Sequence, residues 1–472
     1  RGRRLALHHI YGVRARDLRW RITPPTPQLI SALRALFPAL PHQPAKPSLS
    51  VSHPDPFKPE RYLDFVRQNL RLLLFGMVLT FCSSFGQTFF IGLFNQPIRD
   101  AYGLSHAGFG TLYLLATLSS AATIIWAGLK IDSVELRRYA SLVIIGLALS
   151  ASLMAASQHL VFLFMAIFGL RLTGQGLMGH TATIAMARYL GASRGKGLSI
   201  SALGMPLGEA FWPVAITFLL ISAALPWRML WLGIAVGLAI VLLPLVWWLL
   251  HDQAARDDAL KAANDRETAN KPPSERLRHR DLLRDAKFIG VMPYILAAPF
   301  ILTGFFFHQQ ALSADRGWAL TQMASFYVLY AGGSLTMSLI IGPVVDRITA
   351  TRLVPITCLP LFFGIMAFWL IEIPLGGALL FALAGMSTGM AIPILNAMWA
   401  EVYGVQDLGR VRALVSSLMV ISTALAPPLF GFVLDQQWGG DTIALGALAY
   451  LALAYGLMLS AYGKLQRAAA RS

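Results

Sequence analysis

The chain has 472 residues, of which 56% are hydrophobic and only 13% are charged. A soluble domain of this length carries about 25% charged residues, so the composition argues against a soluble protein and indicates that much of the surface lies in a lipid bilayer. The formal net charge of +16 does not indicate a nucleic-acid partner, because the basic residues lie between apolar runs and do not cluster on one face. The two cysteines, Cys82 and Cys358, lie inside apolar segments, so no metal, cofactor or disulfide framework is expected.

Residues 1–60 differ from the rest of the chain. They are rich in arginine, poor in acidic residues, and interrupted by prolines between residues 24 and 47 that block any long helix. An organelle transit peptide shares the arginine-rich, acid-poor composition, but serine is sparse here. We therefore expect 1–60 to be a disordered tail, or a segment added for expression, that takes no part in the fold.

Twelve apolar stretches follow. Each is long enough to cross a hydrocarbon core of about 30 Å, which takes roughly 20 helical residues. They must be helices, because lipid offers no hydrogen-bond partners to backbone groups. The predicted spans cover about 70–95, 107–129, 139–157, 160–187, 198–222, 227–250, 288–311, 320–345, 353–371, 374–398, 411–434 and 441–462.

The basic residues predict how these spans are oriented. The connections after even-numbered spans hold most of the Lys and Arg residues outside the tail, whereas the other five hold only Arg99, Arg228 and Arg316. Because positively charged loops stay in the cytoplasm, both termini are predicted to be cytoplasmic in a multi-pass protein of the cell membrane. The hydrophilic stretch 251–287 has nine basic residues and divides the spans six and six, so it is predicted to be a linker.

The two sets of six spans are an internal duplication. Span two and span eight align at a constant offset of 214 residues, which pairs Tyr113 with Tyr327 and Asp132 with Asp346. An offset that covers six spans and a connection makes the halves parallel repeats, with the binding site expected between them near the middle of the membrane. The predicted architecture is all-α, with six-helix bundles at 61–250 and 288–465 and a short C-terminal tail at 466–472.

A glycine-to-aspartate motif occurs after both spans two and eight. The first copy runs from Gly128 to Asp132, and the second runs from Gly342 to Asp346 and Arg347. With two bundles and a basic linker, this doubled motif resembles the major facilitator superfamily over about residues 62–465. The second copy keeps the Asp-Arg pair of the family, whereas the first has Ser133 in place of the arginine. The resemblance implies that these five residues are a gating motif that closes the cytoplasmic side in the outward-open state.

Arg171 is the only one of the 39 Lys and Arg residues that lies deep in a predicted span. It stands 11 residues into span four, at a depth of about 16 Å, where an arginine is costly unless it meets a partner or a water-filled cavity. The only acidic residue of similar depth is Glu209 in span five. We therefore predict that the two side chains pair, or that they exchange partners when a proton or an anionic substrate arrives. The family resemblance adds that an arginine at this position of span four is implicated in coupling.

The family resemblance also implies that spans one, four, seven and ten line the cavity. Within these spans the polar residues are candidates for contact with substrate, although a helix–helix hydrogen bond is an equal alternative for each. The predicted candidates beside Arg171 and Glu209 are Gln87, Gln175, His308, Gln309 and Asn396.

These observations predict a secondary transporter that moves a small solute by alternating access. A lone buried arginine favours an organic anion such as a carboxylate, and Glu209 is the expected site of proton coupling. A drug or cation/proton antiporter of the same superfamily is the alternative, although Glu209 stands where such antiporters have proline. A non-transporting membrane sensor is the alternative of another class. We expect no enzymatic activity and a monomer whose partners are the substrate, the proton and the lipid.

Overall fold

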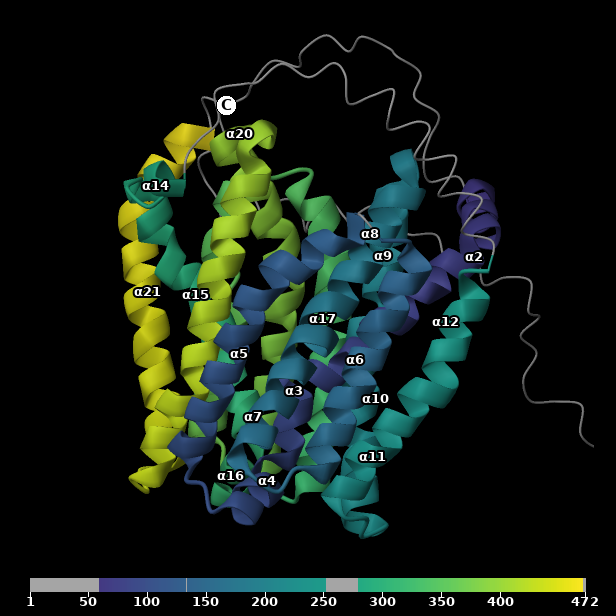
Figure 1. Ribbon diagram of the computed structural model, residues 1–472. Coiled ribbons are helices and arrows are strands. Elements are labelled where there is room, and N and C mark those ends of the chain that lie inside the picture. Colours follow the sequence, from purple (N-terminus) through teal and green to yellow (C-terminus); the bar gives the residue numbers. More distant parts are fainter. Residues whose placement is uncertain (1–58, 133, 252–278, 470–472) are drawn as a thin grey trace, which may run out of the picture. The chain divides into compact units, whose positions relative to one another are not determined.

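The computed structural model describes residues 59–132, 134–251 and 279–469 (Figure 1). The predicted N-terminal tail, most of the predicted linker and the end of the C-terminal tail lie outside these residues. The described residues from Leu63 onward belong to one compact unit. We call residues 59–251 the N-half and residues 279–469 the C-half.

The described residues contain twelve helices that are long and apolar enough to cross a membrane. The predicted class, an all-α protein with twelve transmembrane helices, is confirmed. The N-half consists of α2 (Pro59–Cys82), α3 (Thr88–Ile91), α4 (Asn95–Tyr102), α5 (His106–Leu129), α6 (Leu136–Ala156), α7 (Leu160–Gly169), the π-helix η4 (Leu170–Met178), α8 (Gly179–Tyr189), α9 (Arg194–Ala202), α10 (Gly204–Thr217), α11 (Trp227–Gly237) and α12 (Leu243–Leu249). The C-half consists of α14 (His279–Leu282), α15 (Ala286–Phe307), α16 (Gln309–Asp315), α17 (Leu320–Val345), α18 (Ala350–Leu353), α19 (Leu359–Leu370), α20 (Pro374–Asp435) and α21 (Gly439–Ala469).

Several spans depart from a single regular α-helix, most clearly span one and the joined spans ten and eleven. Span one was predicted at about 70–95, but α2 already ends at Cys82 and the chain resumes its helical course in α3 and α4. Helix α20 contains spans ten and eleven, joined across Gly404, whose φ of 77° and ψ of 162° are not helical. A positive φ of this size is accessible to glycine because it has no Cβ, so Gly404 lets the chain reverse between the two spans.

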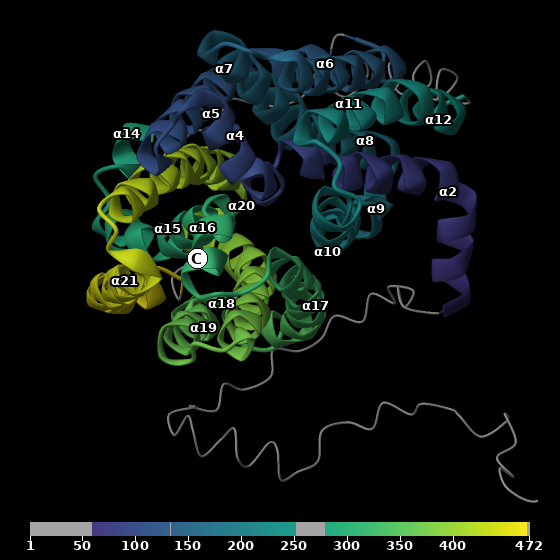
Figure 2. The ribbon, with the colours of Figure 1, turned by 90° about the horizontal axis from the view of Figure 1, so that it is seen from below.

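The two sides of the unit can be named from the ends of the helices. The linker side is the one on which α12 ends and α15 begins. The far side, at the lower edge of Figure 1, is the one on which α4 and α16 lie. Figure 2 views the unit from the far side and shows the spans of the N-half (purple to teal) and of the C-half (green to yellow) as two groups.

Two helix pairs form the most extensive contacts between the halves: α5 packs on α20, and α10 packs on α17 (Figure 2). Glycines allow the first pair to approach closely. A Cβ on Gly110 would lie 2.6 Å from the carbonyl carbon of Pro427, and a Cβ on Gly431 would lie 2.5 Å from the carbonyl carbon of His106. Small residues are the usual means by which membrane helices pack, so α5 and α20 meet backbone to backbone.

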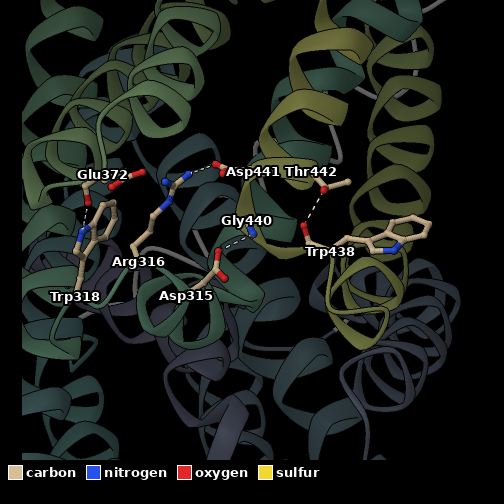
Figure 3. Close-up of polar contacts among 8 residues, drawn as sticks. All are labelled: Asp315, Arg316, Trp318, Glu372, Trp438, Gly440, Asp441 and Thr442. Carbon is tan, nitrogen blue, oxygen red and sulfur yellow. Dashed lines mark hydrogen bonds and ion pairs between the residues drawn. The ribbon is translucent and has the colours of Figure 1, made fainter.

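The far-side connections of the C-half are bonded to one another (Figure 3). The contacts drawn include the ion pair of Arg316 with Asp441, the hydrogen bond from the Gly440 N–H to the Asp315 carboxylate (2.7 Å), and that from the Trp318 indole N–H to the Glu372 carbonyl (2.7 Å). These contacts join the ends of four spans of one half. We infer that this end of the C-half behaves as one body.

Candidate functional site

The site begins at the break in span one. After α2, residues Ser83–Gly86 form a single 3-10 turn, and Gln87 is extended, with φ −82° and ψ 153°. Serine and glycine are poor helix formers, and the break leaves backbone carbonyls without helical partners. Such irregular backbone is tolerated at membrane depth only where it is buried in protein or lines a cavity. The break therefore supplies hydrogen-bond acceptors in the interior of the N-half.

Arg171 uses one of these acceptors. Its side chain is only 4% exposed, and Nη1 donates to the carbonyl oxygen of Gly86 at 3.2 Å, with a longer contact of 3.5 Å to Oγ1 of Thr88. The guanidinium lies over the ring of Tyr113, 5.0 Å from its centroid, which is a cation–π contact. Its Nε has no hydrogen-bond partner. These contacts hold the guanidinium in place, and its Nε–H group remains free to donate a hydrogen bond.

The predicted direct pairing of Arg171 with Glu209 is wrong for this conformation. No ion pair joins them in the described part of the chain, although both line the same cavity. The carbonyl of Gly86 already takes part of the donor capacity of Arg171, and sequence alone could not reveal this carbonyl. Glu209 instead lies within electrostatic range of Tyr327 and Tyr330 on α17, and no described residue donates a hydrogen bond to it.

The cavity lies between the two halves and has a volume of about 460 Å³. It extends from Phe89 and Phe306, near the far side, to Trp399 and the exposed Arg412 toward the linker side. We interpret it as a central cavity that opens toward the linker side. The predicted candidates that line it are Gln87, Arg171, Gln175, Glu209 and Asn396.

His308 and Gln309, also predicted to contact substrate, do not line the cavity. They lie at the far-side end of span seven, and both are fully buried. The Nε2–H of His308 donates to the carbonyl oxygen of Pro427 at 2.8 Å. Neither residue is placed to bind a solute in the cavity. The prediction failed because α15 ends at Phe307, and the chain turns at His308 into the far-side helix α16 instead of continuing along the cavity wall.

The two walls of the cavity differ in chemistry. The N-half wall has both deep charges, Arg171 and Glu209, with two glutamines beside them. The larger C-half wall is mainly apolar and aromatic, with hydroxyl groups between. Its named contributors include Phe306, Tyr330, Trp399, Thr303, Ser387, Thr388 and Ser416. Sequence analysis missed these residues because single hydroxyl and aromatic residues are common in every membrane span.

Arg171 lies in η4, a nine-residue π-helix in the middle of span four. Glycines in this stretch let span one approach. A Cβ on Gly174 would lie 2.8 Å from both N and Cα of Gly86, whereas nothing lies within 4 Å of a Cβ on Gly179, five residues further along the span. π-Helical segments inside α-helices often occur at functional sites. This one places Arg171 against the broken backbone of span one.

The Gly174→Ala variant is expected to be less stable by about 1–3 kcal/mol, because the added methyl group overpacks the contact with Gly86. The Gly179→Ala variant, its matched control, is expected to keep or slightly raise stability, since alanine favours a helix over glycine. The measurement is the midpoint of thermal unfolding in detergent. Equal midpoints for the two variants would contradict the close contact between spans one and four.

The doubled gating motif lies on the linker side. Gly128 packs against His180, whose Nε2 lies 3.3 Å from the Gly128 carbonyl oxygen, within the N-half. Nothing lies within 4 Å of a Cβ on Gly342. The side chain of Asp132 lies outside the described residues. The latching role of this motif therefore stays a prediction.

The described residues contain twelve membrane-spanning helices in two groups with a cavity between them, an arrangement typical of a membrane carrier for solutes. The family model of the Major Facilitator Superfamily matches residues 76–381 and 309–470. The chain belongs to this superfamily, which makes it a membrane transporter of the secondary type. A search of curated proteins found no match.

Solved structures show the same fold. A bacterial homologue of the human lysosomal transporter Spinster, in an inward-facing and unoccupied conformation, aligns with a TM-score of 0.60 at 13% identity, over 86% of this chain and 98% of that one. The nucleoside transporter NupG aligns with a TM-score of 0.62 at 14% identity, over 84% and 98%. A D-xylose-proton symporter aligns with a TM-score of 0.60 at 14% identity, over 82% and 97%. At these identities the likeness concerns the fold alone.

Proposed function

We propose that this transporter moves a small organic anion, such as a carboxylate, by alternating access and with proton coupling. The observation that supports the proposal best is the state of Arg171. It is a buried cation at the cavity wall, with no carboxylate partner among the described residues and one unused N–H donor. A charge in such a place calls for a counter-charge, and a carboxylate matches the planar geometry of a guanidinium.

The chemistry of the walls limits the rest of the solute. A carboxylate bound at Arg171 faces the mainly apolar and aromatic surface of the C-half across the cavity, with hydroxyl groups from Thr388 and its neighbours within that surface. This arrangement suits an anion with an apolar body and few polar groups. The same cation disfavours the alternative of a cationic drug, which Arg171 would repel.

Glu209 supports the proton coupling. Its carboxyl group lies at the cavity and has no hydrogen-bond donor or ion-pair partner among the described residues. With Glu209 ionised, the charges of Glu209 and Arg171 cancel, and an incoming anion gains little. With Glu209 protonated, the deep cavity has a net charge of +1, which the anion neutralises. Proton and anion therefore bind more favourably together than separately, which is the requirement for symport.

The proposal is tested by uptake into proteoliposomes that contain the purified protein. The panel consists of monocarboxylates of increasing apolar size, a sugar, a nucleoside and an organic cation, each with and without an inward proton gradient. We expect carboxylates to be taken up and the proton gradient to increase their accumulation. Uptake of the cation or the neutral solutes without uptake of any carboxylate would overturn the anion proposal.

We also propose that the linker side faces the cytoplasm of the cell, as the basic connections suggest. Single cysteines are introduced at Glu372 on the far side and at Gly195 on the linker side, in a chain without Cys82 and Cys358. Both positions are exposed. A membrane-impermeant maleimide applied to intact cells is expected to label the cysteine at 372 and not the one at 195. The reverse pattern would overturn the orientation.

A further inference from the structure

The far-side end of the cavity is closed where span one crosses span seven. At this crossing Gly92 of the N-half lies directly against the carbonyl oxygen of Phe306, with no room for a side chain. Two amide side chains flank the contact. Asn95, the first residue of α4, is 2% exposed, and Gln309, the first residue of α16, is fully buried.

The two amides bond across the interface in opposite directions. Asn95 of the N-half donates from Nδ2 to the carbonyl oxygen of Phe307 at 2.9 Å. Gln309 of the C-half donates from Nε2 to the carbonyl oxygen of Phe89 at 2.8 Å. Phe307 is the last residue of α15, where carbonyls lack partners within the helix. Phe89 lies in α3, just after the break in span one. Each half thus donates one side-chain hydrogen bond to a backbone carbonyl of the other.

The two donors occupy equivalent positions of the duplicated halves. Asn95 and Gln309 are 214 residues apart, which is the offset that aligns span two with span eight. Residues at equivalent positions of two repeats can touch only at the axis that relates them. This condition holds for Gln96 and Gln310, also 214 apart, because the Gln96 N–H donates to Oε1 of Gln310 at 2.7 Å. The pseudo-twofold axis therefore passes close to the crossing. The two amide bonds are not exact equivalents, because their acceptors Phe89 and Phe307 are 218 residues apart.

We propose that Asn95 and Gln309 form an amide clasp that acts as the far-side gate, and that both of its hydrogen bonds must break before the cavity can open to that side. The crossing lies directly beyond the cavity-lining residues Phe89 and Phe306, so it closes the far-side end of the cavity. The proposal goes beyond the proposed function and does not depend on the solute.

The hydrogen bonding of the clasp is incomplete in the closed state, which favours its opening. In the closed state the second amide atom of Gln309, Oε1, is buried beside the Tyr327 side chain and makes no hydrogen bond of ordinary geometry. Opening admits water, which can satisfy this atom as well as the two donors, so the loss of the bonds is partly offset. A fully satisfied amide pair would hold the gate shut more strongly. The partial satisfaction suits a contact that must form and break in every cycle.

The experiment measures how quickly a cavity cysteine is modified from each side. Thr303 lines the cavity and is half-buried, so Thr303→Cys is introduced in the chain without Cys82 and Cys358. A membrane-impermeant thiol reagent is applied to sealed membranes of each orientation, without substrate. The clasp variants are Asn95→Leu, Gln309→Met and their combination, which remove the donors and approximately keep the side-chain volumes.

We expect far-side modification to accelerate about three- to fivefold in each single variant, which is the effect of losing one hydrogen bond of ordinary strength. The double variant should show a larger increase. Modification from the linker side should not accelerate, because the two open states exchange in one equilibrium and a gain of one is a loss of the other. The matched control is Asp441→Asn, which breaks a far-side ion pair within the C-half alone and should leave both rates unchanged.

Two results would overturn the proposal. Unchanged far-side modification in the double variant would show that the amides do not hold the gate. An equal acceleration in Asp441→Asn, or acceleration from both sides at once, would indicate a general loosening of the far side. The midpoint of thermal unfolding of each variant shows whether it is folded before the rates are compared.

Discussion

Carboxylate uptake by the Arg171→Ala variant is expected to need a roughly 10- to 100-fold higher substrate concentration for half-saturation than uptake by the wild type. The variant loses the charge-assisted bonds to the anion, each worth about 1.5–3 kcal/mol. It also loses the cation whose charge the substrate neutralises. The measurement is initial uptake into proteoliposomes over a range of carboxylate concentrations at fixed pH.

Loss of fold has to be distinguished from loss of binding, because Arg171 also holds the carbonyl of Gly86 in the broken span. Substrate-dependent stabilisation makes this distinction. Saturating carboxylate should raise the thermal midpoint of the wild type and leave that of a folded Arg171→Ala variant unchanged. Arg412→Ala is the matched control, since Arg412 lines the cavity but is exposed. Its effect should be small and should decrease with salt. Normal uptake by Arg171→Ala would refute the anion site.

The fold was predictable because lipid permits few structures. Long apolar stretches must become helices, and the 214-residue offset fixed the relation of the halves. The local departures from helix were not predictable in the same way. The break at Ser83–Gly86 and the π-helix around Arg171 depend on the close packing of Gly86 against Gly174, which is a contact between distant segments. They decide where the guanidinium points, so the pairing with Glu209 was predicted wrongly.

The site residues were predicted unevenly for the same reason. Gln87, Gln175 and Asn396 line the cavity as the resemblance implied. Gln309 does not, because span seven breaks its helical course at His308, and residues beyond that point belong to the far-side crossing. The sequence did contain a usable indication. The offset of 214 places Gln309 at the position equivalent to Asn95, near the end of span one.

Glu209→Gln is expected to abolish accumulation driven by a proton gradient and to spare exchange of the anion. Glutamine keeps the shape of the side chain and mimics the protonated carboxyl group, so the cavity keeps the net charge of +1 that favours the anion. For one proton per anion, a gradient of one pH unit can accumulate the anion about tenfold. The variant should reach a ratio near one, measured as internal over external labelled carboxylate at steady state.

Exchange is the measurement that makes this prediction specific. Counterflow of labelled against unlabelled carboxylate requires binding and alternating access but no net proton movement, so it should continue in Glu209→Gln at a rate similar to that of the wild type.

Glu135→Gln is the control, because Glu135 pairs with the exposed Arg138 outside the cavity and should leave accumulation intact. If Glu209→Gln still accumulated carboxylate against its gradient, the proton would have to bind elsewhere. Glu209, which has no hydrogen-bond donor among the described residues, would then have no role in proton coupling. If both accumulation and exchange were lost, Glu209 would belong to the binding of the solute.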